Sequence, residues 1–311
     1  MTGVLTITSC DSGELELTNP NTLSPETFFK TETQVQSAVN ASYANLQTRG
    51  LYGRNFSFAM DLMAQDALGN PQLEGNKKPF QDFSFNGGND IIQYYWESCY
   101  TGISRANFVL DNEQKINALP DNVLSQEKKN KYLGEAHFLR AYYYFTLVKM
   151  FGDVPLFTDK RLSLTDSKSL KRAPKADVYK QIEADLTAAI AVLPPTQIQK
   201  GRITKYAAQA LLGKVYLYEG KNSLAAAEFA EVNGTPGGTS MYGYKLLTKF
   251  SDLWVISNKF NSEAIIEIMH TDKSNADWGF WGGGADEGNS VNIMVGPRGY
   301  ERVSNTLPDY V

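Results

Sequence analysis

Aromatic and planar polar side chains gather in a glycine-rich stretch near the end of this 311-residue sequence. Trp278, Trp281 and Tyr300 provide aromatic planes, and Asn275 and Arg298 provide planar hydrogen-bonding groups. A sugar ring presents a flat face of C–H bonds bordered by hydroxyl groups, so its site needs an aromatic plane with polar groups at the edge. The glycine-rich flanks favour a surface loop. We therefore predict a ligand-binding site at these five residues, with packing of the rings onto the protein as the alternative.

The acidic residues do not indicate a reaction. Glycoside hydrolysis uses two carboxyl groups about 5–10 Å apart, and nothing in the sequence pairs Asp61, Asp66 or Asp286. A serine nucleophile elbow and a Walker loop are also missing from the sequence. Residues 286–289 lack the spacing of a calcium-binding loop. We expect a binding protein that uses no catalytic residue, metal or cofactor.

Composition narrows the classes of partner. The formal net charge of −4 provides no basic field for a nucleic acid, so that partner is excluded. The sequence has no run of about eighteen apolar residues, so we expect no membrane-spanning helix. Cys10 and Cys99 are too few for a disulfide framework, and no cysteine and histidine spacing suits a metal.

The first residues resemble the end of a bacterial lipoprotein signal. Residues 4–10 form a short apolar stretch that closes with Ser9 and Cys10. We predict that residues 1–9 are a signal remnant, that Cys10 carries a lipid, and that residues 10–23 are an acidic, solvated tether. No Lys or Arg precedes Cys10, so the basic start of such a signal is missing. The alternative is that Cys10 is an ordinary cysteine near the amino terminus.

The clearest helix pattern lies at residues 132–151. One face carries apolar residues at spacings of three and four, and a second face does the same (Tyr132, Ala136, Leu139, Tyr143, Leu147 and Met150; Phe138, Ala141, Phe145 and Val148). A helix that is apolar on two sides packs between neighbours. Gly152 and Pro155 end it. Within it, we expect His137 to pack with a hydrogen bond and Arg140 to hold a loop carboxylate or a helix end.

Other periodic segments predict further helices. One opens at Ser24, a capping residue followed by Pro25. Residues 58–68, 92–110 and 178–193 follow, and the helix at 92–110 places Trp96 and Cys99 at core spacing. Residues 50–90 and those after 233 are mostly irregular, which is typical of functional loops. At residues 263–268 we favour a short strand.

A helix pair at residues 212–229 has the spacing of a tetratricopeptide repeat. Gly213 and Ala225 let the two helices approach, Tyr216 and Phe229 fill the space beside them, and Gly220 makes the turn. Together with the other helices, this pair predicts a mainly all-α fold. We expect stacked tetratricopeptide-like helix pairs, long irregular loops and a few short strands.

Several of these motifs together resemble one family. The segments at residues 139–147 and 151–156 (Leu-Arg-Ala-Tyr-Tyr-Tyr-Phe-Thr-Leu and Phe-Gly-Asp-Val-Pro-Leu) resemble the signature of the SusD/RagB-like lipoproteins of Bacteroidetes. Supporting positions are Trp96, Tyr100, Ile103, Arg105–Asn107, Asp185-Leu186 and Leu193-Pro194. The resemblance implies a SusD-like helical domain over residues 24–311 with inserted ligand-binding loops. It also implies that the carboxyl-terminal part of the family fold is absent.

The same resemblance implies a function. A protein of this kind is a surface glycan-binding lipoprotein of the outer membrane. It faces the exterior, touches the membrane through a lipid anchor only, and passes an oligosaccharide to a TonB-dependent, SusC-like transporter. Three alternatives stay open. They are a lipoprotein of the same family for peptides or other nutrients, a tetratricopeptide-type scaffold for protein partners, and a glycan-degrading enzyme.

Overall fold

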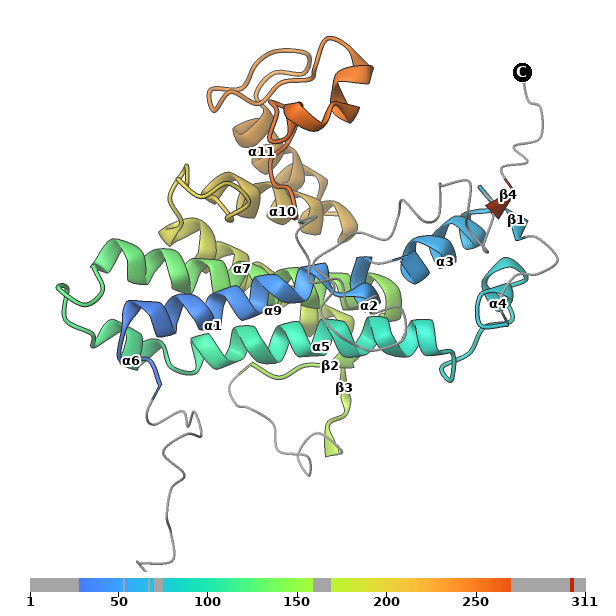
Figure 1. The fold of residues 1–311 in the computed structure, drawn as a ribbon, viewed down its shortest axis with the longest axis horizontal. Helices are drawn as coiled ribbons and strands as arrows, with labels where there is room; N and C mark the ends of the chain where they lie inside the picture. The colour runs from blue at the N-terminus through green and yellow to red at the C-terminus, as the bar shows by residue number, and fades with distance from the viewer. Residues whose placement is uncertain are drawn as a thin grey trace, which may run out of the picture.

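The computed structural model describes residues 28–52, 54–66, 68–69, 75–158, 169–269 and 303–304. Over these residues the fold is mainly helical, as predicted, and its helices lie side by side in a stack (Figure 1). The long helices are α1 (Glu32–Ala44), α3 (Arg54–Ala64), α5 (Asp90–Leu110), α7 (Gln126–Phe151), α9 (Lys175–Val192), α10 (Lys205–Tyr218) and α11 (Asn222–Asn233).

Short elements join these helices. Helical turns stand at η2 (Asn45–Gln47), α2 (Arg49–Tyr52), α4 (Lys78–Gln81), α6 (Glu113–Asn117), η3 (Phe250–Trp254) and η4 (Ile256–Asn258). Two antiparallel pairs of two-residue strands complete the described elements: β1 (Leu68–Gly69) with β4 (Val303–Ser304), and β2 (Val154–Pro155) with β3 (Arg172–Ala173). The predicted few short strands are therefore confirmed.

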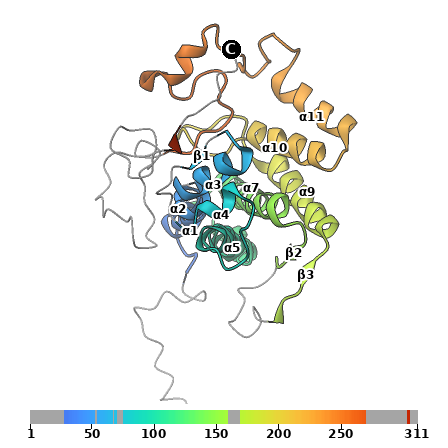
Figure 2. The same cartoon turned by 90° about the vertical axis from the view of Figure 1, so that its right-hand side faces the viewer.

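Helix α7 is the centre of the stack. It packs against α5 and α1 on one side and α9 on the other, and α9 continues into α10 and α11 (Figure 2). The Ser125 side chain caps its first turn by accepting from the Lys128 N–H, and Gly152 ends it at a φ of 68°. Both predicted apolar faces are buried, except that Met150 in the last turn is 42% exposed. The predicted enclosed helix is thus confirmed.

The predicted helix pair is also present. The Thr204 side chain caps α10, and Gly220 makes the turn to α11 at a φ of 75°. A Cβ atom on Gly213 would lie 2.8 Å from the ring of Phe229, so only glycine allows this approach of α11. The two helices therefore pack as closely as those of a tetratricopeptide repeat, and α10 extends the stack by packing against α9.

Two boundaries differ from the prediction. Helix α1 begins at Glu32, where the Thr31 side chain accepts from the Gln34 N–H, and residues 28–31 form bends rather than helix. Phe29 has a φ of 65° there and packs 5.0 Å from Phe108, which fixes the chain outside the helix. Ser24, the predicted cap, lies outside the described residues.

The predicted strand at residues 263–268 is wrong. This segment is irregular, because its side chains bind the backbone of neighbouring loops instead of forming a ladder. Glu263 accepts from the Leu247 N–H at 2.7 Å, and Glu267 accepts from the Phe260 N–H at 2.7 Å. Weak alternation of apolar residues is therefore a poor guide to strand structure in this segment.

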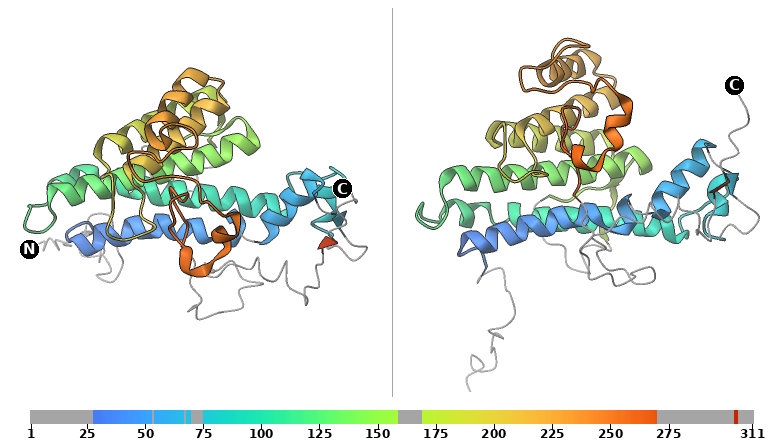
Figure 3. Two further views of the ribbon diagram at one scale, coloured as in Figure 1. Left: turned by 90° about the horizontal axis from the view of Figure 1, so that it is seen from above. Right: turned by 45° about the horizontal axis from the view of Figure 1, so that its top comes forward.

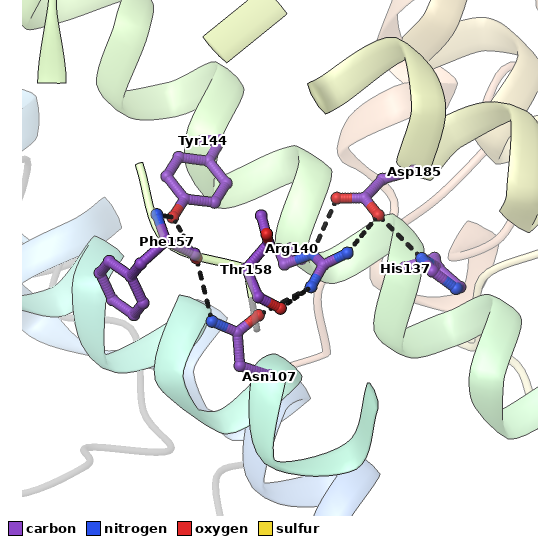
Figure 4. Close-up of polar contacts among 7 residues, drawn as sticks. All are labelled: Asn107, His137, Arg140, Tyr144, Phe157, Thr158 and Asp185. Carbon is purple, nitrogen blue, oxygen red and sulfur yellow. Dashed lines mark hydrogen bonds and ion pairs between the residues drawn. The ribbon is translucent and has the colours of Figure 1, made fainter. Parts of the chain in front are cut away.

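A buried ion pair joins α7 to α9. Arg140 donates from Nε to Oδ2 of Asp185 at 2.8 Å and from Nη2 to Oδ1 at 2.7 Å (Figure 4). Nδ1 of His137 lies 2.8 Å from the same carboxylate. Burial alone raises the pKa of Asp185, but the hydrogen bonds from His137 and Arg140 outweigh it and hold that pKa below its usual value. The packing role expected of His137 is confirmed, and Arg140 holds a carboxylate, although one on a helix.

The same arginine reaches the chain that follows α7. Its Nη1 donates to the Thr158 carbonyl and to Oδ1 of Asn107 on α5, both at 2.9 Å. Asn107 donates in turn to the Phe157 carbonyl at 3.1 Å. The Tyr144 hydroxyl donates to that carbonyl at 2.7 Å and accepts from the Phe157 N–H at 2.9 Å (Figure 4). Residues 154–158 are therefore fixed against α5 and α7 by side chains from both helices.

We expect Gly102→Ala to destabilise the fold by about 1–3 kcal/mol. The added Cβ would lie 2.4 Å from the Tyr143 ring, which is buried and held by its 2.7 Å hydrogen bond to the Ser42 carbonyl. This overlap outweighs the gain in helix propensity of about 1 kcal/mol. Urea unfolding measures the change. Gly75→Ala, where no atom lies within 4 Å of the new Cβ, is the control, and equal effects of both changes would contradict the packing described.

We expect Arg140→Leu to cost about 3–5 kcal/mol, because Asp185 is left as a buried, poorly paired charge. The double change Arg140→Leu with Asp185→Leu should recover much of this loss, since it removes both charges. Lys128→Leu is the control. That change breaks an exposed pair with Glu32 at 2.8 Å and should cost no more than about 1 kcal/mol in urea unfolding. A double variant as unstable as Arg140→Leu would contradict this account.

Candidate functional site

The residues predicted to bind ligand lie outside the described residues. This holds for Asn275, Trp278, Trp281, Arg298 and Tyr300, and also for Cys10 and Asp286. The candidate site therefore consists of side chains from the described part of the chain. Metal sites were not predicted, and among the described residues no group of three or more His, Cys, Asp or Glu side chains could hold an ion.

A polar pocket lies where the chain passes from α4 to α5. We call it the α4–α5 pocket; it measures about 320 Å³ and is lined by Asn76, Pro79, Ser84, Phe85, Asn86, Gly88, Asn89 and Asp90. Its volume falls at the small end of the range for ligand sites, about 300–1,000 Å³. Amide and carboxylate groups dominate the lining, and an aromatic ring stands among them. The same combination of an aromatic ring with planar polar groups was predicted at residues 275–300.

Hydrogen bonds between distant residues hold the pocket in shape. Asn89 caps α5 by accepting from the Ile91 N–H at 2.9 Å, and its Nδ2 donates to the Asn76 carbonyl at 2.7 Å. Asn76 donates from Nδ2 to the two carboxylate oxygens of Asp90 at 3.1 and 3.2 Å. In the turn, Asn86 accepts from the Gly88 N–H at 2.9 Å. The polar groups are therefore positioned before any ligand arrives.

Two phenylalanines stand beside these groups. Phe85 is stacked on Phe80, with ring centroids 5.2 Å apart. Phe83 is 53% exposed and has a φ of 56°, a conformation that is rare for a bulky residue. The strained backbone of such a residue costs on the order of 1–3 kcal/mol and is typical of functional sites. Phe83 is thus an exposed ring directly before Ser84, which lines the pocket, whereas Phe85 lines the pocket itself; neither ring was predicted from the sequence.

A side-chain hydrogen bond also closes the turn. The Asp82 carboxylate accepts from the Ser84 hydroxyl at 2.7 Å, and this hydrogen bond is the main reason that the pKa of Asp82 is lowered. The acid stays ionised and acts as an acceptor. Of the acids considered for catalysis, Asp61 and Asp66 are exposed, and the pKa of Asp61 is raised by partial burial and then by the charge of Asp66.

Strand β4 pairs with β1 in this part of the molecule. Leu68 of β1 lies opposite Ser304, and Gly69 lies opposite Val303. Strand β1 in turn contacts α4, and Figure 1 shows α3, α4, β1 and β4 together at one end of the stack. Strand β4, which begins three residues after Tyr300, therefore pairs with a strand that contacts α4, and Pro79 of α4 lines the α4–α5 pocket.

Trp96 differs partly from its predicted place in the core. It packs edge-on against Phe151 with centroids 5.0 Å apart, but it is only half-buried and also lines a second cavity between α1 and α5. Cys99, one turn further on, is fully buried as predicted. Among the described helices, none has both the length and the apolar character that crossing a membrane requires.

Comparisons with known proteins agree on one family. The profile of the SusD-like family, described as starch-binding and associating with the outer membrane, matches residues 15–217. A SusD-like protein of Formosa agariphila, named P2, is 32% identical over 226 residues, which is 72% of this chain and 44% of that protein. A SusD-like protein of Bacteroides ovatus is 27% identical over 205 residues, which is 62% of this chain and 36% of that protein.

Solved structures give the same answer. A laminarin-binding SusD-like protein superposes with a TM-score of 0.76 at 43% identity, covering 86% of this chain and 58% of that one. A SusD-like protein of Bacteroides fragilis superposes with a TM-score of 0.65 at 26% identity, covering 80% of this chain and 46% of that one. The chain spans about half the length of the relatives it matches. On its sequence and its fold, the chain belongs to the SusD-like family.

Proposed function

We propose that this protein is a glycan-binding lipoprotein of the cell surface. It captures an oligosaccharide and passes it to a TonB-dependent, SusC-like transporter of the outer membrane, and it breaks no bond in doing so. Family membership supports carbohydrate binding, because the family is described as starch-binding. The laminarin-binding relative, at 43% identity, makes laminarin oligosaccharides the first ligands to test.

The α4–α5 pocket is the observation that carries the proposal. The Phe85 ring lines the pocket together with Asn86 and Asp90, so an aromatic plane borders its planar polar groups. We infer that the exposed ring of Phe83, directly before Ser84 of the lining, extends this aromatic surface. A sugar uses both features at once, with its C–H face on the ring and its hydroxyl groups on the amides and the carboxylate. Because the hydrogen bonds of Asn76 and Asn89 already hold this arrangement, the protein loses little conformational entropy when a ligand binds.

The aromatic stretch of the sequence analysis completes the proposed site. Tyr300 precedes β4 by three residues, a separation that spans at most about 11 Å. Since β4 pairs with β1 beside α4, we infer that Tyr300 contributes to the same glycan site. Asn275, Trp278, Trp281 and Arg298 stay predictions from the sequence. The pocket alone is small, and these residues would extend it to hold several sugar units.

The carboxylates around the pocket favour binding over catalysis. Asp90 accepts from Asn76 through both oxygens, so its carboxylate already serves as a fixed acceptor. Asp82 accepts from Ser84, and its pKa is lowered, whereas a general acid for glycoside cleavage needs a raised pKa. The membrane part of the proposal rests on the sequence. Cys10 would carry the lipid and residues 10–23 would be the tether of a domain that begins at residue 24, on the outer face of the cell.

We expect Phe83→Ala to weaken the binding of laminarin oligosaccharides by tenfold or more, because the exposed aromatic plane is removed. Isothermal titration calorimetry measures the affinity. Phe250→Ala, which removes a 73% exposed ring on η3 away from the pocket, is the matched control and should bind like the unchanged protein. Equal affinities for both variants would contradict the pocket assignment, and binding of peptides but no glycan would contradict glycan capture.

We expect radiolabelled palmitate to enter the native protein at Cys10. Cys10→Ser should abolish both the label and recovery in the membrane fraction. Cys99→Ser is the control and should keep the label, because Cys99 is fully buried and burial raises the pKa of its thiol far above the usual value. A soluble, unlabelled product of the native gene would contradict the lipoprotein assignment.

A further inference from the structure

A second cavity lies further along α5. It measures about 810 Å³ and is bounded by α1 on one side and α5 on the other, two helices that run side by side (Figures 1 and 3). We call it the α1–α5 groove. Four rings line it, those of Phe28, Trp96, Tyr100 and Phe108, and small residues of α1 such as Ala41 leave the space between the helices open. The proposed glycan site does not use it.

The aromatic wall of the groove is held rigidly. Tyr100 is stacked on Phe157, with centroids 5.8 Å apart and planes 13° apart, and its hydroxyl donates to the Pro155 carbonyl at 2.8 Å. Trp96 lies 4.9 Å from Tyr100 and is supported from behind by Phe151. Because the hydrogen bonds of Tyr144 and Asn107 fix the backbone of Phe157, the ring on which Tyr100 stacks is held in place.

Polar side chains stand among these rings. Glu97, Thr101 and Ser104 follow one face of α5 at spacings of four and three, and all three line the groove. Ser37 stands on the opposite wall. Arg105 donates from Nη1 to the Ala41 carbonyl of α1 at 2.9 Å, which uses one of its five N–H groups and fixes its guanidinium at the edge of the groove.

This lining selects among ligand chemistries. A hydrocarbon ligand would displace water from Glu97 and Arg105 without replacing its hydrogen bonds, and this desolvation costs free energy. An anionic ligand would meet the Glu97 carboxylate in a protein of net charge −4. A saccharide suits both parts of the lining, since it has C–H faces for the rings and hydroxyl groups that donate to carboxylates and accept from guanidinium and hydroxyl groups.

We propose that the α1–α5 groove is a second carbohydrate-binding site, an inference that rests on the proposed glycan-binding function. The two sites share one helix. At a rise of about 1.5 Å per residue, Glu97 lies about 10 Å and Arg105 about 22 Å along α5 from Asp90 of the α4–α5 pocket. A long glycan can therefore contact both sites, and its second contact is intramolecular, which raises its apparent affinity without new chemistry.

Calorimetry with a laminarin disaccharide, which is too short to occupy both sites at once, tests the proposal on the full chain. The unchanged protein should bind two ligands. Ser37→Trp, which fills the groove from α1, should bind one, and so should Ser104→Trp, which fills it from α5. Ser223→Trp places the same side chain at an exposed serine of α11, outside the groove, and should still bind two. Two variants from opposite walls keep the test valid if one of them does not fold.

Each outcome has a distinct meaning. One ligand per chain in the unchanged protein, with the same affinity in both groove variants, overturns the second site and leaves the proposed function intact. The absence of binding for every glycan in every variant overturns both proposals. Loss of one ligand in the groove variants, while Phe83→Ala loses the other, supports both.

Discussion

The buried ion pair between Arg140 and Asp185 is the contact on which the arrangement of this protein depends. Two charges that leave water cost several kcal/mol, and the loss is offset only where geometry and further hydrogen bonds are good. The arginine uses Nε and both terminal nitrogens, on Asp185, Asn107 and the Thr158 carbonyl. These partners belong to α9, α5 and the segment after α7. One side chain of α7 thus fixes the relative positions of three parts of the stack.

A second buried pair does the same five residues earlier on α7. Arg202 donates to Glu135 at 2.9 Å, and the glutamate is fully buried. Burial raises the pKa of Glu135, and the positive charge of Arg202 opposes that rise. Apolar packing alone would let helices slide along one another, because it has no direction. Charged groups that must meet specific partners at two points on the central helix favour one register, so the polar groups contribute specificity and the apolar faces most of the stability.

The parts of the structure that follow a helical period could be predicted from the sequence. Helices α5, α7 and α9 and the pair α10–α11 were found because buried residues recur every three or four positions, and Gly102 and Gly213 mark where helices approach closely. The α4–α5 pocket has no period. It depends on Asn76 meeting Asn89 and Asp90 thirteen and fourteen residues later, a contact that only the folded chain reveals. Trp96 shows a further limit: spacing identified its helical face but not how far the neighbouring helix covers it. The five predicted ligand residues stay a prediction.

Helix α5 explains how such a scaffold can recognise a ligand. Its buried face carries Cys99, Ile103 and Asn107, which tie it to α7, while its first turn forms part of the α4–α5 pocket and its exposed face lines the α1–α5 groove. Recognition groups on one fixed helix keep constant distances from one another. When a flexible sugar chain binds to such a surface, the ordering cost falls mainly on the ligand, because the protein was ordered when it folded. For both proposed sites the buried ion pair of α7 therefore matters from a distance, since it keeps α5 and the segment beneath its aromatic rings in place.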